Sequence, residues 1–476
     1  MKRFAAAGLA LVLGSSCLVS IAGAATHPGE AQFRTLYKEL VETNTSLSAG
    51  DCTLAAQRMA AHLKAAGFAD SELTIFVPPD HPKEGGLVAV YPGTDTKLKA
   101  MLLLAHIDVV EAKREDWTRD PFVLVEENGN FYARGVIDDK SMAAMFTDSL
   151  VRLKTAKFKP RRTIKLALTC GEETSSALNG ARWLTENKRE LVDAAFVINE
   201  GAWGELDKDG NKVAMLVQAG EKLPQDFDLV VTNGGGHSSR PVKDNAIYHL
   251  AAALTRIGAY EFPAQFNDGN RAYFSAMAGI QDKKGEKEIA NAMRAFLKNP
   301  DDTAALALVS GKDPSWNATL RTTCVATMLD GGHATNALPQ RAHANVNCRI
   351  FPGVDREVIR AKLSELAADP QVKVTTGAFR NGTAPVPPLT PAIMKPFEKL
   401  NAKYFPGVPV VPVLQAGATD GAFFNAMGIP TYGMAPVFIG PDLGHVHGLN
   451  EYVSVESLLT GRDFLHELIQ IYATQK

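Results

Sequence analysis

The sequence contains few cysteines for its length and no excess of charge of either sign. Only five of its 476 residues are cysteine, and no two of them form a Cys-x-x-Cys motif. This scarcity excludes a disulfide-rich scaffold, and thiolate metal sites and thioredoxin-like redox chemistry have no support. Fifty Lys and Arg residues stand against 52 Asp and Glu residues, without a basic block. The balance argues against nucleic acid as a partner.

Internal repeats and low-complexity tracts are also absent. With 46% hydrophobic and 21% charged residues, the composition is that of a soluble globular protein and excludes disordered, collagen-like and coiled-coil chains. At 476 residues the chain is too long for one ordinary domain. We therefore expect two or three domains.

Long apolar runs are confined to the N-terminus. Two basic residues precede an apolar stretch at 4–21, which is followed by small residues at 22–24. This order is typical of a cleavable signal peptide, so we predict that residues 1–24 are removed and that the protein is periplasmic or secreted. An uncleaved anchor and a lipoprotein attached through Cys17 are the alternatives. No later segment is apolar enough to span a bilayer, so we expect no stable membrane insertion after signal removal.

Strand-like and helix-like segments alternate in the first half of the mature chain. The strand-like runs are 86–91, 98–105, 164–170 and 194–198, and the helical patterns include 31–67, 141–153 and 176–187. Such alternation predicts a mostly parallel sheet with helices on both faces. Ligands of these sheets bind beyond the carboxyl ends of the strands.

The pattern changes after about residue 220. A strand-helix-strand-strand-helix-strand order follows, with an additional helical stretch near 285–310, and fits a small ferredoxin-like α+β domain. A proline cluster that begins at Pro385 indicates a hinge before the chain returns to the first domain. We predict a catalytic domain made of 25–220 and 381–476, interrupted by an inserted lid or dimerisation domain at 221–380.

Two cysteines fall on neighbouring predicted strands of the insertion. Cys324 lies in the apolar-alternating run 320–329, and Cys348 lies in the run 342–351. If these runs pair as antiparallel strands, the two cysteines come close to opposite each other. A cross-strand disulfide between them is therefore a hypothesis.

Side chains of metal-binding type follow several predicted strands. His106 and Asp108 follow one strand, and Glu172 and Glu173 follow another. The other members of this set are Asp138, Asp139, Glu200 and His447. Each group has an ordinary alternative, such as a structural histidine or acidic residues at a helix start. Carboxylates crowded at one sheet edge need a counter-charge, however, and two divalent metal ions would supply it.

The order of these motifs resembles the co-catalytic dizinc hydrolase family of glutamate carboxypeptidase, aminoacylase and succinyl-diaminopimelate desuccinylase. The likeness covers essentially the whole mature chain. It implies a zinc-exopeptidase-like α/β fold, with a mixed, mostly parallel sheet flanked by helices. It also implies two Zn²⁺ ions, with Co²⁺ or Mn²⁺ as substitutes. The implied ligands are His106, Asp138 and Glu200 for one ion and His447, Asp138 and Glu173 for the other, with Asp138 as the bridge.

The same resemblance implies roles for the neighbouring residues. Glu172 is expected to be the general base that later protonates the leaving amine. Asp108 is expected to accept the other imidazole N–H of His106. A cis peptide bond is expected between Asp138 and Asp139.

Three residues of the insertion match substrate-contacting positions of the family. His237 matches a histidine that reaches from the partner subunit in dimeric relatives and stabilises the tetrahedral oxyanion. Asn336 matches a substrate-contacting asparagine, and Arg349 matches an arginine suited to a substrate carboxylate. A turn or surface role is the alternative for each. A homodimer through the insertion is therefore a hypothesis, and a monomer with an enlarged insertion is its alternative.

The expected function is dizinc-dependent hydrolysis of an amide bond in small peptides or N-acyl amino acids, beside a free carboxylate. Exopeptidase activity, as a carboxypeptidase or dipeptidase, is the leading hypothesis, and N-acyl amino acid deacylation is the alternative. A non-catalytic binding module that retains the fold is the alternative from another class. Departures from the family pattern leave the substrate open, among them Gly171 before the Glu pair and Gly201 after Glu200.

Overall fold

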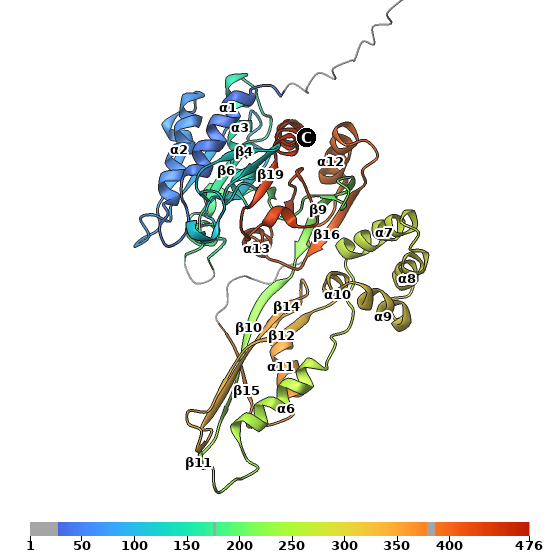
Figure 1. The fold of residues 1–476 in the computed structure, drawn as a ribbon. Helices are drawn as coiled ribbons and strands as arrows, with labels where there is room; N and C mark the ends of the chain where they lie inside the picture. The colour runs from blue at the N-terminus through green and yellow to red at the C-terminus, as the bar shows by residue number, and fades with distance from the viewer. Residues whose placement is uncertain (1–26, 175–177, 378–385, 476) are drawn as a thin grey trace, which may run out of the picture.

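A ten-stranded mixed sheet forms the centre of the larger part of the molecule (Figure 1). The computed structural model describes residues 27–174, 178–377 and 386–475, so the predicted signal peptide lies outside the described residues, as does Pro385. The strands are β1 (Leu73–Phe76), β2 (Gly86–Tyr91), β3 (Met101–His106), β6 (Ile164–Thr169), β7 (Phe196–Asn199), β8 (Gly204–Leu206), β9 (Lys212–Glu221), β16 (Val410–Gln415), β17 (Thr431–Gly433) and β18 (Phe438–Ile439). Their order is β1-β2-β6-β3-β7-β17-β9-β8-β18, with β16 paired to β9.

The central strands are parallel and buried on both faces. β3 runs parallel to β6 and β7, and every residue of β3 is buried. Leu103 belongs to the core on one face of the sheet, and Leu102 and Leu104 belong to the core on the other. A continuous apolar strand of this kind is typical of a parallel sheet covered on both sides. The predicted α/β class is therefore confirmed.

Helices cover both faces of this sheet. One face carries α1 (Glu30–Glu42), α2 (Cys52–Ala65), α3 (Lys140–Thr155), α12 (Pro391–Tyr404) and α14 (Val455–Thr474), and the other carries α4 (Gly180–Asn187), α5 (Arg189–Val192) and α13 (Gly421–Ala426). The helical pattern predicted over 31–67 is two helices, because Asp51 caps a new helix by accepting from Leu54 N. A small sheet of β4 (Val125–Glu127), β5 (Asn130–Tyr132) and β19 (Tyr452–Ser454) joins the two parts of the chain.

An elongated arm extends from the ends of β9 and β16 (Figure 1). Its four-stranded antiparallel sheet has the order β12-β14-β10-β15, from β10 (Leu223–Thr232), β12 (Thr323–Gly331), β14 (Arg341–Ile350) and β15 (Lys373–Thr376). α6 (Ala246–Gly258) and α11 (Arg356–Ala367) cover one face of it. The order β10-α6-β12-β14-α11-β15 is the predicted order, and the whole sheet falls within 221–380.

Four more helices lie between α6 and β12. They are α7 (Asp268–Lys283), α8 (Lys287–Lys298), α9 (Thr303–Lys312) and α10 (Pro314–Leu320), and they share an apolar core of their own. The helical stretch predicted near 285–310 is therefore part of a longer helical region. β11 (Gly236–His237) and β13 (Ala337–Leu338) pair at the far end of the arm. No helix of the described residues is both long and apolar enough to cross a membrane.

Within residues 27–174, 178–377 and 386–475, the structure contains two disulfides. Cys324 and Cys348 lie opposite each other on β12 and β14 and are bonded, which confirms the cross-strand hypothesis. Cys52 and Cys170 form a second bond across 118 residues of sequence, which the sequence did not indicate.

Candidate metal centre

The carboxyl ends of β3, β6 and β7 bring the predicted ligands together. His106 is the last residue of β3, Glu200 directly follows β7, and Glu172 and Glu173 lie a few residues beyond β6. β3 lies between β6 and β7 in the sheet, so these side chains meet at one edge. Asp138 comes from the segment before α3, and His447 comes from the loop after a short 3-10 turn (Leu443–His445).

Two groups of side chains have a geometry suited to metal ions. In the first, His106 Nε2 lies 3.1 Å from Asp138 Oδ1 and 3.6 Å from Glu200 Oε1. In the second, His447 Nε2 lies 2.8 Å from Glu173 Oε1 and 3.1 Å from Asp138 Oδ2. Asp138 thus directs one carboxylate oxygen to each group, the arrangement that a bridging ligand requires. The peptide bond between Asp138 and Asp139 is cis, as the resemblance implied.

The donor set fits two divalent cations. Each group offers one imidazole nitrogen and two carboxylate oxygens, a combination that Zn²⁺, Co²⁺ and Mn²⁺ accept. Four of the five side chains have relative exposures of 13% or less, so their carboxylates are costly to keep ionised without a cation. Only His447, with a side chain that is 53% exposed, faces solvent.

The pKa shifts at the site also indicate that it favours positive charge. Burial raises the pKa of Glu200 and of Glu172, and neighbouring carboxylates add to both shifts. Hydrogen bonds to Asp138 and Glu173 raise the pKa of His447 to about 10. Burial opposes charge on His106, but its contacts with acidic neighbours outweigh burial and raise its pKa. The acidic cluster therefore favours positive charge at this position, which two divalent cations would supply.

Asp108 contacts the site differently from the expectation. His106 Nδ1 lies 3.1 Å from the main-chain carbonyl oxygen of Asp108 and 3.6 Å from its Oδ1, so the hydrogen bond goes to the carbonyl. The Asp108 carboxylate instead accepts from the backbone N–H groups of Glu172 and Glu173, at 3.3 and 3.0 Å. Asp108 therefore contacts His106 through its main-chain carbonyl and supports the Glu172–Glu173 pair through its carboxylate.

A buried ion pair beneath the bridging residue was missed at the sequence level. Arg134 Nη1 donates to Glu451 Oε2 at 2.8 Å, and both side chains are at most 3% exposed. The Glu451 carboxylate also accepts from the backbone N–H groups of Gly135 and Ile137. Glu451 lies four residues after His447, and only that proximity could have drawn attention to it.

A cleft beside the two groups is lined by residues that bind no metal. Trp203, Gln218, Gln415 and Thr419 line it together with Glu172 and four of the five predicted ligands, all except His106. A Cβ atom at Gly201 would lie 2.0 Å from Gln218 Oε1, and the φ of this residue is 119°, so the position favours glycine. The lining combines one aromatic ring with uncharged amides.

Two of the three predicted substrate-contacting residues lie away from this centre in their own chain. His237 is in β11 at the far end of the arm, and the Ser238 N–H donates to the carbonyl of Asn336 there (Figure 1). Arg349 is on β14, opposite Pro224 near the start of β10, and so lies at the end of the arm closer to the large sheet. Burial lowers the pKa of this arginine.

Comparison with known proteins agrees with this geometry. A model of the family described as "Peptidase family M20/M25/M40" matches residues 102–471. The human N-fatty-acyl-amino acid synthase/hydrolase PM20D1 is 30% identical over 406 residues, which cover 83% of this chain and 79% of that protein.

Solved structures share the fold. The M20 family metallo-carboxypeptidase Sso-CP2 from Sulfolobus solfataricus superposes with a TM-score of 0.68 at 19% identity, covering 93% of this chain and 99% of that one. The Bacillus subtilis YXEP protein, a dinuclear metal-binding peptidase of the M20 family, gives a TM-score of 0.56 at 14% identity, covering 93% and 97%.

Proposed function

The chain belongs to peptidase family M20/M25/M40, and on that premise we propose that it is a dizinc hydrolase that cleaves an amide bond beside a free carboxylate. The observation that carries the proposal is the pair of ligand groups that share Asp138, with Glu172 beside them and free of either group. When bound, two divalent cations supply Lewis acidity toward the amide carbonyl and acidify the attacking water.

Glu172 is the general base of this proposal. Its carboxylate lines the cleft, while its neighbour Glu173 belongs to the ligand group of His447. Burial raises the pKa of Glu172 above its ordinary value, which makes the carboxylate a stronger base than an exposed glutamate. Glu172 takes a proton from the attacking water and returns it to the nitrogen of the leaving amine.

The test of this role is Glu172→Gln, which keeps the shape of the side chain and removes its basicity. We expect kcat to fall by about 10²- to 10⁴-fold while two metal equivalents stay bound. Glu186→Gln is the matched control, because Glu186 is an exposed residue of α4 paired with Arg182. A Glu172→Gln protein that retains the wild-type rate with metal bound would overturn the proposal.

Zinc is the proposed native metal. Two imidazoles and three carboxylates support this choice, although Co²⁺ and Mn²⁺ accept the same donors. Elemental analysis of the purified protein, followed by chelation and reconstitution with each metal, tests it. Less than one equivalent of metal, without chelator-sensitive hydrolysis, would instead favour a non-catalytic binding module.

The substrate is proposed to be a small peptide or an N-acyl amino acid. Exopeptidase cleavage is the first candidate, and deacylation is supported by the 30% identity to a human N-fatty-acyl-amino acid synthase/hydrolase. A screen of dipeptides against N-acyl amino acids, each paired with its C-terminal amide, separates the two candidates and tests carboxylate recognition together. Substrates that are cleaved equally well as acids and amides would remove the proposed role of Arg349.

We propose that the active form is a homodimer through the arm. His237 and Asn336 lie at the far end of the arm, so a partner subunit is the means by which they would meet a metal centre. β12 is an edge strand of the arm sheet, and Val325, Met328 and Leu329 on it are 60%, 66% and 69% exposed. Unpaired edges and exposed apolar side chains are features of association surfaces.

Mixing two inactive variants tests this dimer directly. His237→Ala and Glu172→Gln each disable a different half of a shared site, so a heterodimer would hold one intact site of two. After subunit exchange at equal concentrations, about a quarter of the wild-type activity should return. A monomer in light scattering, or a mixture without regained activity, would contradict the shared site.

Export to the periplasm or the medium is proposed from the N-terminal pattern, and two disulfides support it because such bonds persist in oxidising compartments. Fractionation of the native host, with N-terminal sequencing of the mature protein, tests both the compartment and cleavage after residue 24.

A further inference from the structure

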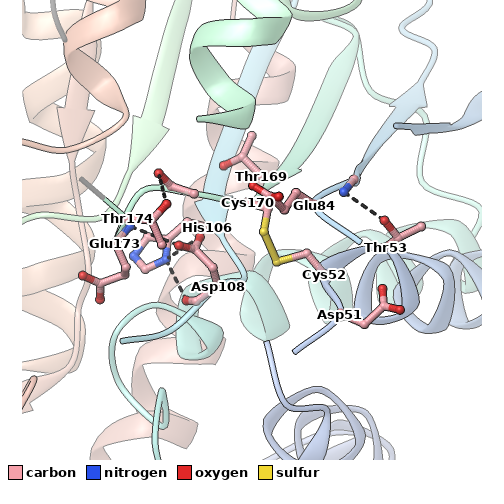
Figure 2. The surroundings of a disulfide bond; sticks show 12 residues. Asp51, Cys52, Thr53, Glu84, His106, Asp108, Thr169, Cys170, Glu173 and Thr174 are labelled. Atoms are coloured by element: carbon pink, nitrogen blue, oxygen red, sulfur yellow. Dashed lines mark hydrogen bonds and ion pairs between the residues drawn. A yellow bond between two sulfur atoms is a disulfide. The ribbon is translucent and has the colours of Figure 1, made fainter. Parts of the chain in front are cut away.

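The segment that carries the proposed general base begins at a disulfide-bonded cysteine. β6 ends at Thr169, and Cys170 follows it, two residues before Glu172. Cys170 is bonded to Cys52, the first residue of α2 (Figure 2). Both cysteines are at most 5% exposed. A covalent bond therefore ties the first turn of a helix to the segment that carries Glu172 and Glu173.

Cys52 is itself firmly held. Its backbone N–H donates to the carbonyl of Lys83 at 2.8 Å, and the side chain of the preceding residue, Asp51, caps the helix. The neighbouring Thr53 donates to the carbonyl of Pro82 and accepts from the N–H of Gly85. The sulfur of Cys52 is thus a fixed point, and the disulfide transmits its position to Cys170.

On the other side of the bond, the backbone of the catalytic segment, residues 170–174, is restrained to one conformation. Gly171 has a φ of 95°, and a Cβ there would lie 1.8 Å from the carbonyl oxygen of Leu178. The backbone N–H groups of Glu172 and Glu173 both donate to the single carboxylate of Asp108. The segment is therefore held covalently at Cys170 and by hydrogen bonds two and three residues later.

The disulfide and the supporting carboxylate border the same space. Cys52, Cys170, Gly171 and Asp108 line a cleft of about 240 Å³ that borders the segment carrying Glu172. Because this cleft borders the segment, space is available for the segment to shift if the bond is removed. A displacement of about 1 Å at reacting groups costs about 100-fold in rate.

We propose that the Cys52–Cys170 disulfide is a positioning element that holds Glu172 in place for proton transfer and Glu173 in place for metal binding. The inference rests on the proposed function, because it assigns the disulfide a purpose only through those two carboxylates. Neither cysteine touches substrate or metal. The bond acts through the segment between it and the two glutamates.

The chain supplies its own matched control. Cys52→Ser with Cys170→Ser removes this bond, and Cys324→Ser with Cys348→Ser removes the other bond, in the arm sheet. We expect the first pair to lower kcat by about 10- to 100-fold with KM changed less than about threefold. The second pair should leave kcat within about twofold.

Two readouts besides activity separate positioning from general stability. Metal affinity of the site formed by Asp138, Glu173 and His447 should weaken by about 10- to 100-fold when Cys52 and Cys170 are replaced, and not when Cys324 and Cys348 are replaced. Competition with a chromophoric chelator measures this affinity. Amide hydrogen exchange should accelerate in peptides covering 171–174 and stay unchanged in those covering Glu200. Melting temperature should fall in both pairs, so it does not discriminate between them.

Outcomes for this inference and for the proposed function are distinguishable. Wild-type hydrolysis that Glu172→Gln abolishes supports the function, whatever the cysteine variants do. If the Cys52 and Cys170 pair then keeps wild-type kcat, metal affinity and exchange, the positioning role is wrong while the function stands. If the double variant Cys52→Ser with Cys170→Ser does not fold, the double variant Cys52→Ala with Cys170→Val is used in its place, because its side chains fill the space that the two sulfur atoms leave. If neither of these two variants folds, the Cys52–Cys170 bond serves folding, and the inference is overturned.

Discussion

Glu451→Gln is expected to lower both the stability of the protein and its metal affinity, although Glu451 belongs to neither ligand group. The carboxylate is fully buried, and four donors converge on it. Arg134 Nη1 and Gly135 N lie 2.8 and 2.9 Å from Oε2, while Ile137 N and Asp138 N lie 3.0 and 3.3 Å from Oε1. Because all four partners donate, only a group with two acceptor oxygens satisfies them.

Glutamine keeps the volume but provides only one acceptor. Its NH₂ group must face either Arg134 and Gly135 or Ile137 and Asp138. The two hydrogen bonds on that side are lost, and the NH₂ group there faces two N–H donors. Hydrogen bonds to charged groups contribute about 1.5–3 kcal/mol each. Removing one member of a buried ion pair costs about 3–5 kcal/mol. We therefore expect the free energy of unfolding of the metal-free protein to fall by about 3–5 kcal/mol.

The same substitution should weaken metal binding. Glu451 holds the N–H group of Asp138, the bridging ligand, and Arg134 Nη2 donates to the carbonyl of Gly448, next to His447. Outer-sphere contacts of this kind change metal affinity by about 10- to 100-fold. Urea unfolding of the chelated protein and chelator competition measure the two effects separately.

An exposed residue of the same type provides the control. Glu456, at the start of α14, is 73% exposed at its side chain, so Glu456→Gln should change neither quantity measurably. The reasoning about the buried pair is refuted if Glu451→Gln loses less than about 1 kcal/mol and binds metal as the wild type does.

The remaining predictions concern proton binding by His447 and Glu221 and the Cys324–Cys348 disulfide of the arm sheet. Hydrogen bonds raise the pKa of His447 to about 10, and this residue must lose its proton to bind metal, so metal affinity should rise with pH from about 6 to 9; a flat profile would contradict this ligand. Burial raises the pKa of Glu221 to about 8, so the folded protein keeps a proton that the unfolded chain has released, and stability falls as pH rises from about 4.3 to about 8. Glu221→Gln should therefore stabilise the metal-free protein by about 1–3 kcal/mol at pH 9 and hardly at all at pH 5; equal effects in urea at both pH values would count against it. Removing the Cys324–Cys348 bond, which spans 24 residues, should lower the free energy of unfolding by about 3 kcal/mol; an unchanged urea midpoint would show that the bond adds no stability.

The α/β architecture and the ligand cluster were predictable because both depend on local patterns. A continuous apolar run marked β3, and its final residue, His106, lies where strand ends collect ligands. Cys324 and Cys348 were paired on the same basis, since two alternating runs close in sequence become neighbouring strands. A strand pattern repeats every second residue, and a ligand at a strand end directly follows such a pattern. Both can therefore be recognised in a single sequence.

Contacts that support the site leave no such pattern. Arg134 and Glu451 are 317 residues apart, and Cys52 and Cys170 are 118 apart, so only the folded chain brings each pair together. The resemblance directed Asp108 toward His106 and could not anticipate that its carboxylate would accept two backbone N–H groups. Contacts between residues so far apart in sequence depend on the folded backbone, and neither composition nor motif spacing reveals them.

The Arg134–Glu451 pair also explains how the exposed ligand is held. His447 has a φ of 60°, a left-handed conformation that costs a non-glycine residue about 1–3 kcal/mol and persists only where the surroundings enforce it. Arg134 is one restraint on this loop, because two nitrogens of its planar guanidinium donate to Glu451 and to the carbonyl of Gly448. A lysine ammonium lacks that fork, so Arg134→Lys should keep the charge and still weaken metal binding by about tenfold or more. Wild-type metal affinity in Arg134→Lys would mean that charge alone holds the loop, and the geometry of the guanidinium would then have no part in the site.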